Sequence, residues 1–104
     1  MRRPDFNKKL ATSIIGKRLL VGLTYINHNN ETTANKQFHG EVIRADQEAG
    51  IVLRLHGSET EFYLPADTSP IEPAPPGDYR LQSSGEVVVN PDFLCTYEIH
   101  SGRR

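Results

Sequence analysis

The stretch FHGEVIRADQEAGIVLRL, residues 38–55, constrains the fold more than any other segment of the chain. It contains two segments of alternating apolar and polar residues on either side of a short polar turn, which is typical of a β-hairpin. A slip of one residue would exchange the two faces of a strand, so the register can be predicted from chemistry. A four-residue loop at DQEA places Val42 opposite Leu53 on the core side and Glu41 opposite Arg54 on the outer side. A five-residue loop would instead place a charged side chain opposite an apolar one, and we favour the first register.

Two glycines fit this hairpin, and an apolar pair on its outer face needs a cover. Gly40 lies on the core face, where a missing side chain lets the strand bend, and Gly50 gives the backbone freedom at the exit of the turn. On the outer face the favoured register pairs Ile43 with Val52. An apolar pair in that position must be covered by a helix, by a loop or by a second chain, so we interpret it as belonging to an interface.

The chain before the hairpin predicts a helix and then a strand. Phe6, Leu10 and Ile14 recur with helical spacing within residues 5–15, and Asp5 is a plausible N-cap for this helix. The following segment, KRLLVGLTYIN, alternates apolar and polar residues as a strand does.

The second half of the chain is divided by proline. Strands are predicted over residues 17–64, and the segment PADTSPIEPAPPG, residues 65–77, is too rich in proline for a helix or a central strand. We expect it to form a long surface loop that either carries function or covers one end of the fold. Residues 78–100 then predict a hairpin around Ser83–Gly85 and a last strand, FLCTYEIH, with alternate residues facing inward.

These elements predict one all-β domain over residues 1–104: a small, closed or nearly closed barrel of bent antiparallel strands. The barrel has an N-terminal helix and a C-terminal hairpin extension.

Five positions of the hairpin resemble the first motif of the Sm family. A glycine, an aliphatic residue two positions later, an aspartate six positions later and two aliphatic residues after the turn reproduce its spacing, in Gly40, Val42, Asp46, Ile51 and Leu53. The resemblance covers about residues 5–64 and implies the Sm-like fold, an N-terminal helix followed by five bent strands.

The same resemblance implies little of the family's RNA-binding apparatus. Of its uridine-binding residues only Asp46 is carried over, because Gly50 stands where the Sm pattern has an asparagine. The segment EFYLPADTSP also has no Arg-Gly pair of the second motif. Weak RNA binding of the Sm type is therefore an alternative function.

The charges of the chain argue against specific nucleic-acid binding. The net charge is −1, but eight of the twelve Lys and Arg residues lie in residues 1–18 and 103–104, which leaves four basic and twelve acidic residues in 19–102. Such an acidic body repels a polyanion, so we expect no specific nucleic acid as a partner.

No apolar run approaches the ~20 residues that a membrane helix needs, and we expect a cytoplasmic protein without a membrane partner. The single cysteine, Cys95, lies in an apolar run and predicts a buried, inert thiol.

Catalytic and metal-binding signatures are weak in this sequence. The four histidines, His28, His39, His56 and His100, do not stand at metal-ligand spacings, and no nucleophile or phosphate-binding motif occurs. We therefore expect no metal site, no cofactor and no catalytic residue. The alternative is a small hydrolase or metal-dependent enzyme that uses His39, His56 and Glu59 beside the proline-rich loop.

Binding requires no arrangement of catalytic residues, and it is the function that the sequence favours. Tyrosines in strand-like segments can form an aromatic groove for a peptide. We therefore expect a non-enzymatic interaction module that binds a protein partner or a second copy of itself. The predicted interface consists of Ile43, Val52, Tyr63 and Tyr79.

Overall fold

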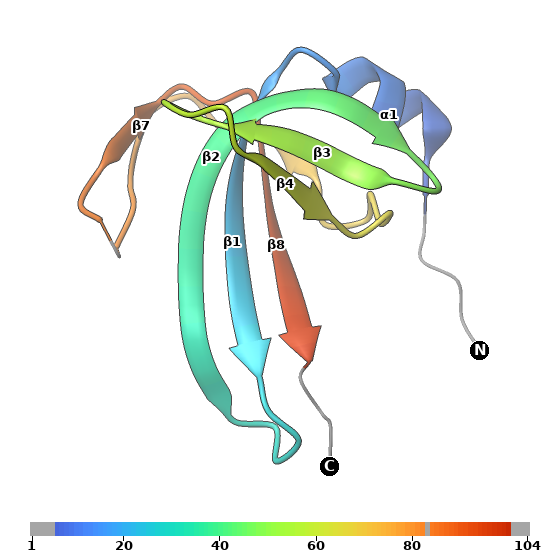
Figure 1. Ribbon diagram of the computed structural model, residues 1–104. Coiled ribbons are helices and arrows are strands. Elements are labelled where there is room, and N and C mark those ends of the chain that lie inside the picture. Colours follow the sequence, from blue (N-terminus) through green and yellow to red (C-terminus); the bar gives the residue numbers. More distant parts are fainter. Residues whose placement is uncertain (1–5, 83, 101–104) are drawn as a thin grey trace.

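The computed structural model describes residues 6–82 and 84–100 of the chain. Within these ranges a single short helix, α1, precedes eight strands, and the fold is mostly β (Figure 1). Helix α1 spans Lys8–Ile14, and Asn7 caps it, with its side-chain oxygen accepting a hydrogen bond from the Leu10 backbone N–H at 3.1 Å. The helix thus lies within the predicted range. The expected N-cap, Asp5, lies outside the described residues, and the cap that the structure shows is Asn7.

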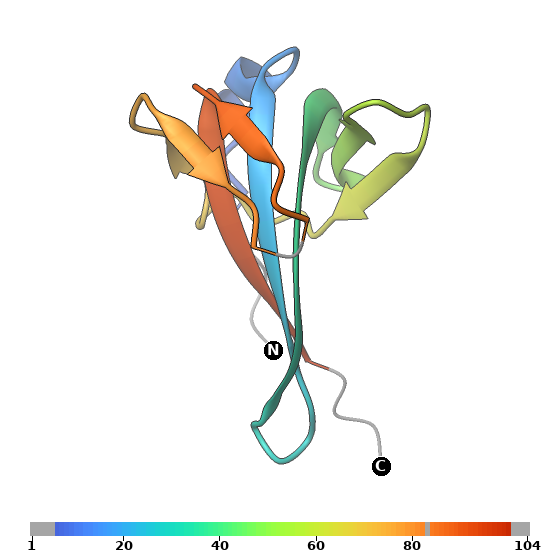
Figure 2. The same cartoon turned by 90° about the vertical axis from the view of Figure 1, so that its left-hand side faces the viewer.

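Six strands form one mixed sheet in the order β4-β3-β2-β1-β8-β5, and two form a separate small sheet (Figure 2). The six are β1 (Arg18–Ile26), β2 (Thr32–Asp46), β3 (Gly50–Leu55), β4 (Glu61–Leu64), β5 (Glu72–Pro73) and β8 (Phe93–His100). The small sheet pairs β6 (Asp78–Arg80) with β7 (Val87–Val89). The long strand β2 arches over the molecule and curls the sheet, but no sheet formed by the described residues closes on itself.

The hairpin of β2 and β3 has the predicted register at its centre. Val42 pairs with Leu53 and Glu41 pairs with Arg54, as expected. Beyond this point a β-bulge at Ile43 shifts the register, so that Val52 faces Arg44. The predicted pairing of Ile43 with Val52 is therefore wrong, because a bulge adds one residue to β2 without changing its apolar pattern.

The last strand runs in a direction that was not predicted from the sequence. Strand β8 pairs with β1 in parallel, with Val21 beside Cys95 and Tyr25 beside Ile99. The expectation of antiparallel strands throughout is wrong at this position. Parallel neighbours need a connection of a dozen or more residues, and the chain between β1 and β8, which contains β2 to β7, is far longer than that.

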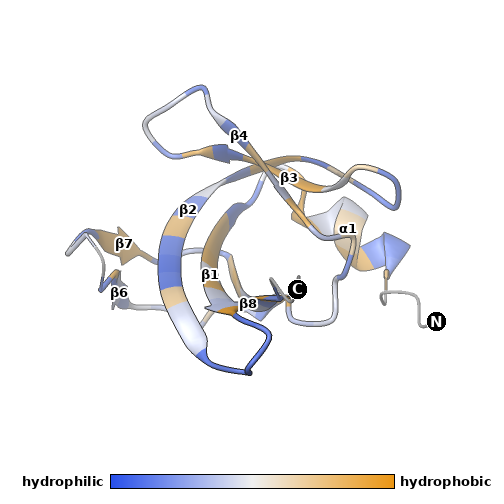
Figure 3. Ribbon diagram, turned by 60° about the horizontal axis from the view of Figure 1, so that its bottom comes forward, coloured by the Kyte–Doolittle hydropathy of each residue, from blue (hydrophilic) through white to orange (hydrophobic). Residues whose placement is uncertain are grey.

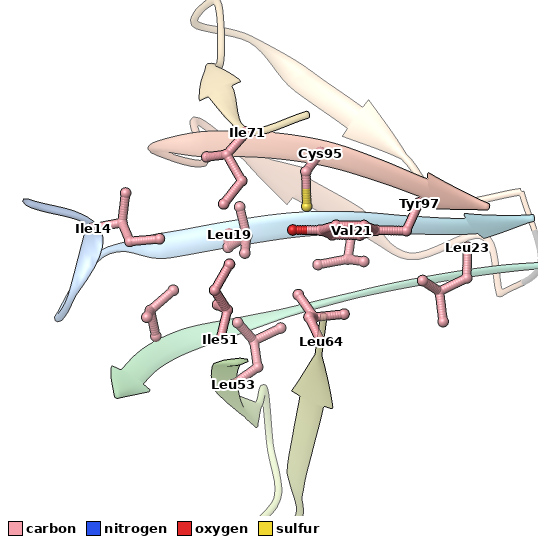
Figure 4. Close-up of a cluster of buried hydrophobic side chains, with 11 residues drawn as sticks. Ile14, Leu19, Val21, Leu23, Ile51, Leu53, Leu64, Ile71, Cys95 and Tyr97 are labelled. Atoms are coloured by element: carbon pink, nitrogen blue, oxygen red, sulfur yellow. The ribbon is translucent and has the colours of Figure 1, made fainter. Parts of the chain in front are cut away.

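The core lies in the concave side of the curled sheet (Figures 3 and 4). Alternate residues of β1 and β8 point into it, as predicted for β8, and the bend of β2 brings β3 and β4 over them. The buried members are Ile14, Leu19, Val21, Leu23, Val42, Ile51, Leu53, Leu64, Ile71, Cys95 and Tyr97. Burial raises the pKa of the Cys95 thiol to about 12, and this agrees with the predicted inert thiol.

The proline-rich segment covers one side of the core. Ile71 is buried in the core cluster, and the Tyr97 hydroxyl donates a hydrogen bond of 2.7 Å to the Asp67 carbonyl oxygen. The Thr68 hydroxyl accepts a hydrogen bond from the Asn7 backbone N–H at 2.8 Å, which joins the segment to the start of α1. Pro73 lies in the edge strand β5, where a missing N–H is tolerated. Of the two roles considered for residues 65–77, these contacts support the cover.

Candidate functional site

The curled sheet leaves a hollow between strands β4 and β8. The hollow has a volume of about 360 Å³, and apolar and aromatic side chains form most of its wall. Strands β1, β4 and β8 supply its lining, together with the residue that follows β4: Leu23, Tyr25, Phe62, Tyr63, Leu64, Pro65 and Ile99.

The hollow exists because the core face of the sheet extends beyond the covered region. Along β1, Leu19 and Val21 are about 1% exposed and Leu23 is 2% exposed, whereas Tyr25 on the same face is only half-buried. Ile99 of β8 is half-buried beside Tyr25 in the same way. The alternation that builds the core therefore continues into a surface that nothing in the described chain covers fully.

A free strand edge borders the hollow. Among the residues that the structure describes, β4 pairs with β3 alone and ends the sheet. Strand β8 has a second neighbour, β5, only at Phe93 and Leu94. Backbone groups on a free edge are available to an added strand, and a charged or twisted edge usually limits such pairing.

A polar groove continues from the hollow between the proline-rich segment and the outer edge of β8. Pro65 lines both, and the groove adds Asp67, Glu98 and His100. The two linings together contain two carboxylates and no Lys or Arg. An occupant with basic side chains would be favoured at this end of the hollow.

The structure brings only one of the four predicted interface residues to this hollow. Tyr63 is 54% exposed and lies at its rim. Val52 is fully buried, because Arg44 and Tyr63 flank it on the outer face and the Arg44 guanidinium contacts the Tyr63 hydroxyl at 3.4 Å. Val52 therefore offers no exposed surface, and its cover is formed within the chain. Ile43 is half-buried at the bulge.

Tyr79 lies apart from the hollow. It belongs to the small β6–β7 sheet, and its hydroxyl donates a hydrogen bond of 2.6 Å to the Pro75 carbonyl oxygen. Tyr63 and Tyr79 thus do not form one aromatic groove. Of the residues that do form the apolar hollow, Tyr25 was among the strand tyrosines considered for a groove. Phe62 and Ile99 were predicted only as members of strands, because alternation does not show where the cover of a core ends.

A second cluster joins two of the three residues considered for an enzyme. His39 at the centre of β2 and His56 just after β3 stack with ring centroids 4.6 Å apart. The third member is Glu86 of the β6–β7 turn, not the predicted Glu59, and His39 Nε2 lies 2.7 Å from a Glu86 carboxylate oxygen. This hydrogen bond lowers the pKa of the Glu86 carboxyl. The cluster lies beside the β6–β7 hairpin, so its predicted position beside the proline-rich loop is wrong.

Comparisons with known proteins add no identification. No protein-family model, no curated protein sequence and no solved structure matches the chain. No helix in the described residues is long and apolar enough to cross a membrane.

Proposed function

We propose that this protein is a non-enzymatic binding module that holds an extended segment of a partner protein in the hollow between β4 and β8. The observation that carries the proposal is an apolar hollow bordered by the free edge of a strand. A partner strand that pairs with β4 forms main-chain hydrogen bonds along this edge and points alternate side chains into the hollow.

The lining defines the chemistry of that segment. Tyr25, Phe62 and Ile99 form an apolar wall for side chains such as Val, Leu or Phe. Phe62 is held in place by a tilted ring contact with Phe38 at 4.7 Å, so this wall is already formed without an occupant. The carboxylates of Asp67 and Glu98 in the adjoining groove favour Lys or Arg at one end of the segment.

The binding module that we propose is an Sm-like small barrel that has opened on one side. The consecutive antiparallel strands β1 to β4 behind an N-terminal helix support this relation over α1 to β4. The parallel β8 and the small β6–β7 sheet are additions to that plan. In this proposal the glycine-bend hairpin shapes the barrel, and Asp46 serves its turn by accepting hydrogen bonds from the N–H groups of Glu48 and Ala49.

A selection from a library of random 12-residue peptides displayed on phage tests the proposal. We expect the wild-type protein to enrich peptides with alternating apolar residues and a flanking Lys or Arg. Substitution Ile99→Lys places a charge in the hollow and should reduce binding of the enriched peptides about tenfold or more, since an unpaired charge at an apolar contact is costly.

The matched control is Val89→Lys, which introduces the same charge at an exposed apolar residue of the small sheet. It should bind the peptides like the wild type. No enrichment on the folded wild-type protein, or equal losses in both variants, would contradict the proposal. Light scattering on the same samples shows whether a second copy occupies the hollow. If the wild type is a dimer and Ile99→Lys dissociates it, the occupant of the hollow is a second copy of the chain and not a foreign partner.

A further inference from the structure

The cluster of His39, His56 and Glu86 contains an ion pair between two of its members and a third side chain, His56, that could also bind a metal ion. Contact between His39 Nε2 and Glu86 at 2.7 Å satisfies these two groups. His56 takes no part in that pair, yet its ring lies against the ring of His39 at an interplanar angle of 25°. One ligand atom from each of the three side chains lies within 4.8 Å of the other two.

Hydrogen bonds of the backbone and of two nearby side chains hold the segments that carry these three residues in position. The His56 backbone N–H donates a hydrogen bond of 3.0 Å to the His39 carbonyl oxygen, which makes the two histidines neighbours in space. The hairpin that carries Glu86 is tied to β2 by the hydrogen bond from the Gln82 N–H to the Gln37 side-chain oxygen at 2.6 Å. The Arg18 guanidinium ties the far end of the hairpin to β1 through the Val89 carbonyl oxygen at 2.9 Å.

From this arrangement we infer that His39, His56 and Glu86 bind one divalent transition-metal ion of the zinc class. Two imidazoles and one carboxylate are a donor set that suits Zn²⁺, Co²⁺, Ni²⁺ and Cu²⁺ rather than Mg²⁺ or Ca²⁺, which prefer oxygen ligands. The site is independent of the hollow between β4 and β8, because the two share no lining residue.

The geometry needs only a small adjustment. Ligand atoms around a tetrahedral ion with bonds of about 2.1 Å lie about 3.4 Å apart. The widest separation in the cluster, 4.8 Å at most, therefore has to shrink by about 1.4 Å. The contact between His39 Nε2 and Glu86, 2.7 Å, has to widen by about 0.7 Å to reach the same spacing. Because His56 and Glu86 are exposed and His39 is less so, we assign both movements to the side chains of His56 and Glu86.

The two histidines of the cluster border an open hollow of about 450 Å³. Both histidines line this hollow together with Gly40, Arg54 and Ser58. Three protein ligands with an open fourth position leave room for a water molecule or a small anion on the metal.

Metal titration of the full chain, prepared without a histidine tag, tests the inference. We expect Zn²⁺ to bind with a stoichiometry of one by calorimetry, and Co²⁺ to give visible absorption bands of a low-coordinate site. His56→Ala and Glu86→Gln should each weaken binding about tenfold or more, since even residues that only orient ligands contribute 10–100-fold to metal affinity.

His100→Ala is the matched control, because His100 also lies near a carboxylate, with Nε2 3.4 Å from Glu98, but belongs to no three-ligand group among the described residues. This variant should bind like the wild type. A second measurement, amide hydrogen exchange, should show that Zn²⁺ slows exchange in the β6–β7 hairpin of the wild type and not of Glu86→Gln. Absence of Zn²⁺ binding in the titration, or binding that His100→Ala weakens as much as His56→Ala, would overturn the inference.

Discussion

Two glycines in neighbouring strands show how much a single side chain decides in this fold. At Gly40, where β2 bends over the core, a Cβ atom would overlap the carbonyl oxygen of Arg54. At Gly22 in β1, a Cβ atom would meet only the Thr96 side chain at an ordinary contact distance of 3.6 Å. The close approach of β3 to β2 at this bend thus requires a missing side chain at Gly40, whereas no such requirement exists at Gly22.

Gly40→Ala should lower the free energy of unfolding by about 2 kcal/mol or more, because the backbone of β3 has to move away from β2. Gly22→Ala should change it by less than about 1 kcal/mol, since a side chain fits there and an alanine restricts the unfolded chain. Urea unfolding followed by circular dichroism measures both values. Equal effects of the two substitutions would contradict the role assigned to Gly40.

At the scale of helices and strands, the pairing of strands that follow one another in the chain could be predicted from the sequence. The relative direction of strands that are far apart in the chain could not. The register at Val42 and Leu53 follows from alternation, whereas the bulge at Ile43 does not, because it leaves the apolar pattern unchanged. Alternation in β8 is equally compatible with parallel and antiparallel pairing, so only the inward faces were predictable. Glu86 reaches His39 through docking of a hairpin 47 residues away, and no local pattern indicates such a contact.

The β6–β7 hairpin is joined to the main sheet by polar ties, and its apolar residues Leu81 and Val88 are buried. Gln37→Ala removes the side-chain acceptor for the Gln82 N–H, a hydrogen bond that contributes about 1 kcal/mol. We expect faster amide hydrogen exchange within β6 and β7, with exchange in β1 and β2 unchanged. Gln47→Ala, in the β2–β3 turn and away from the hairpin, is the control. Unchanged exchange in the hairpin would show that other contacts dock it.

Over the molecule as a whole, the charge distribution disfavours a polyanion such as RNA and favours a peptide with basic side chains. Residues 19–102 carry four basic and twelve acidic side chains. Of the other eight basic residues, Lys8, Lys9, Lys17 and Arg18 lie in the described part of the chain, and residues 2, 3, 103 and 104 lie outside it. A polyanion is therefore repelled by most of the body, whereas a segment with Lys or Arg is attracted to the groove beside the hollow.

Labelled oligo-U and mixed-sequence RNA should accordingly bind weakly, without sequence preference, and lose affinity steeply between two salt concentrations, because only counterion release drives such binding. A chain that lacks residues 1–4 and 103–104 should bind RNA still more weakly, because it loses four of the eight basic residues near the two ends. Sub-micromolar, uridine-selective binding that survives the truncation would instead extend the Sm resemblance to function.

The proposed function depends above all on pairing between an extended partner segment and the free edge of β4 above the apolar hollow. Amide hydrogen exchange, with and without a peptide obtained from the library, reports on this pairing at each backbone N–H. We expect slower exchange in β4, from Glu61 to Leu64, and in the hollow-lining end of β8, with β6 and β7 unchanged. Protection confined to β6 and β7, or bound peptide with no change in β4, would refute the proposed pairing.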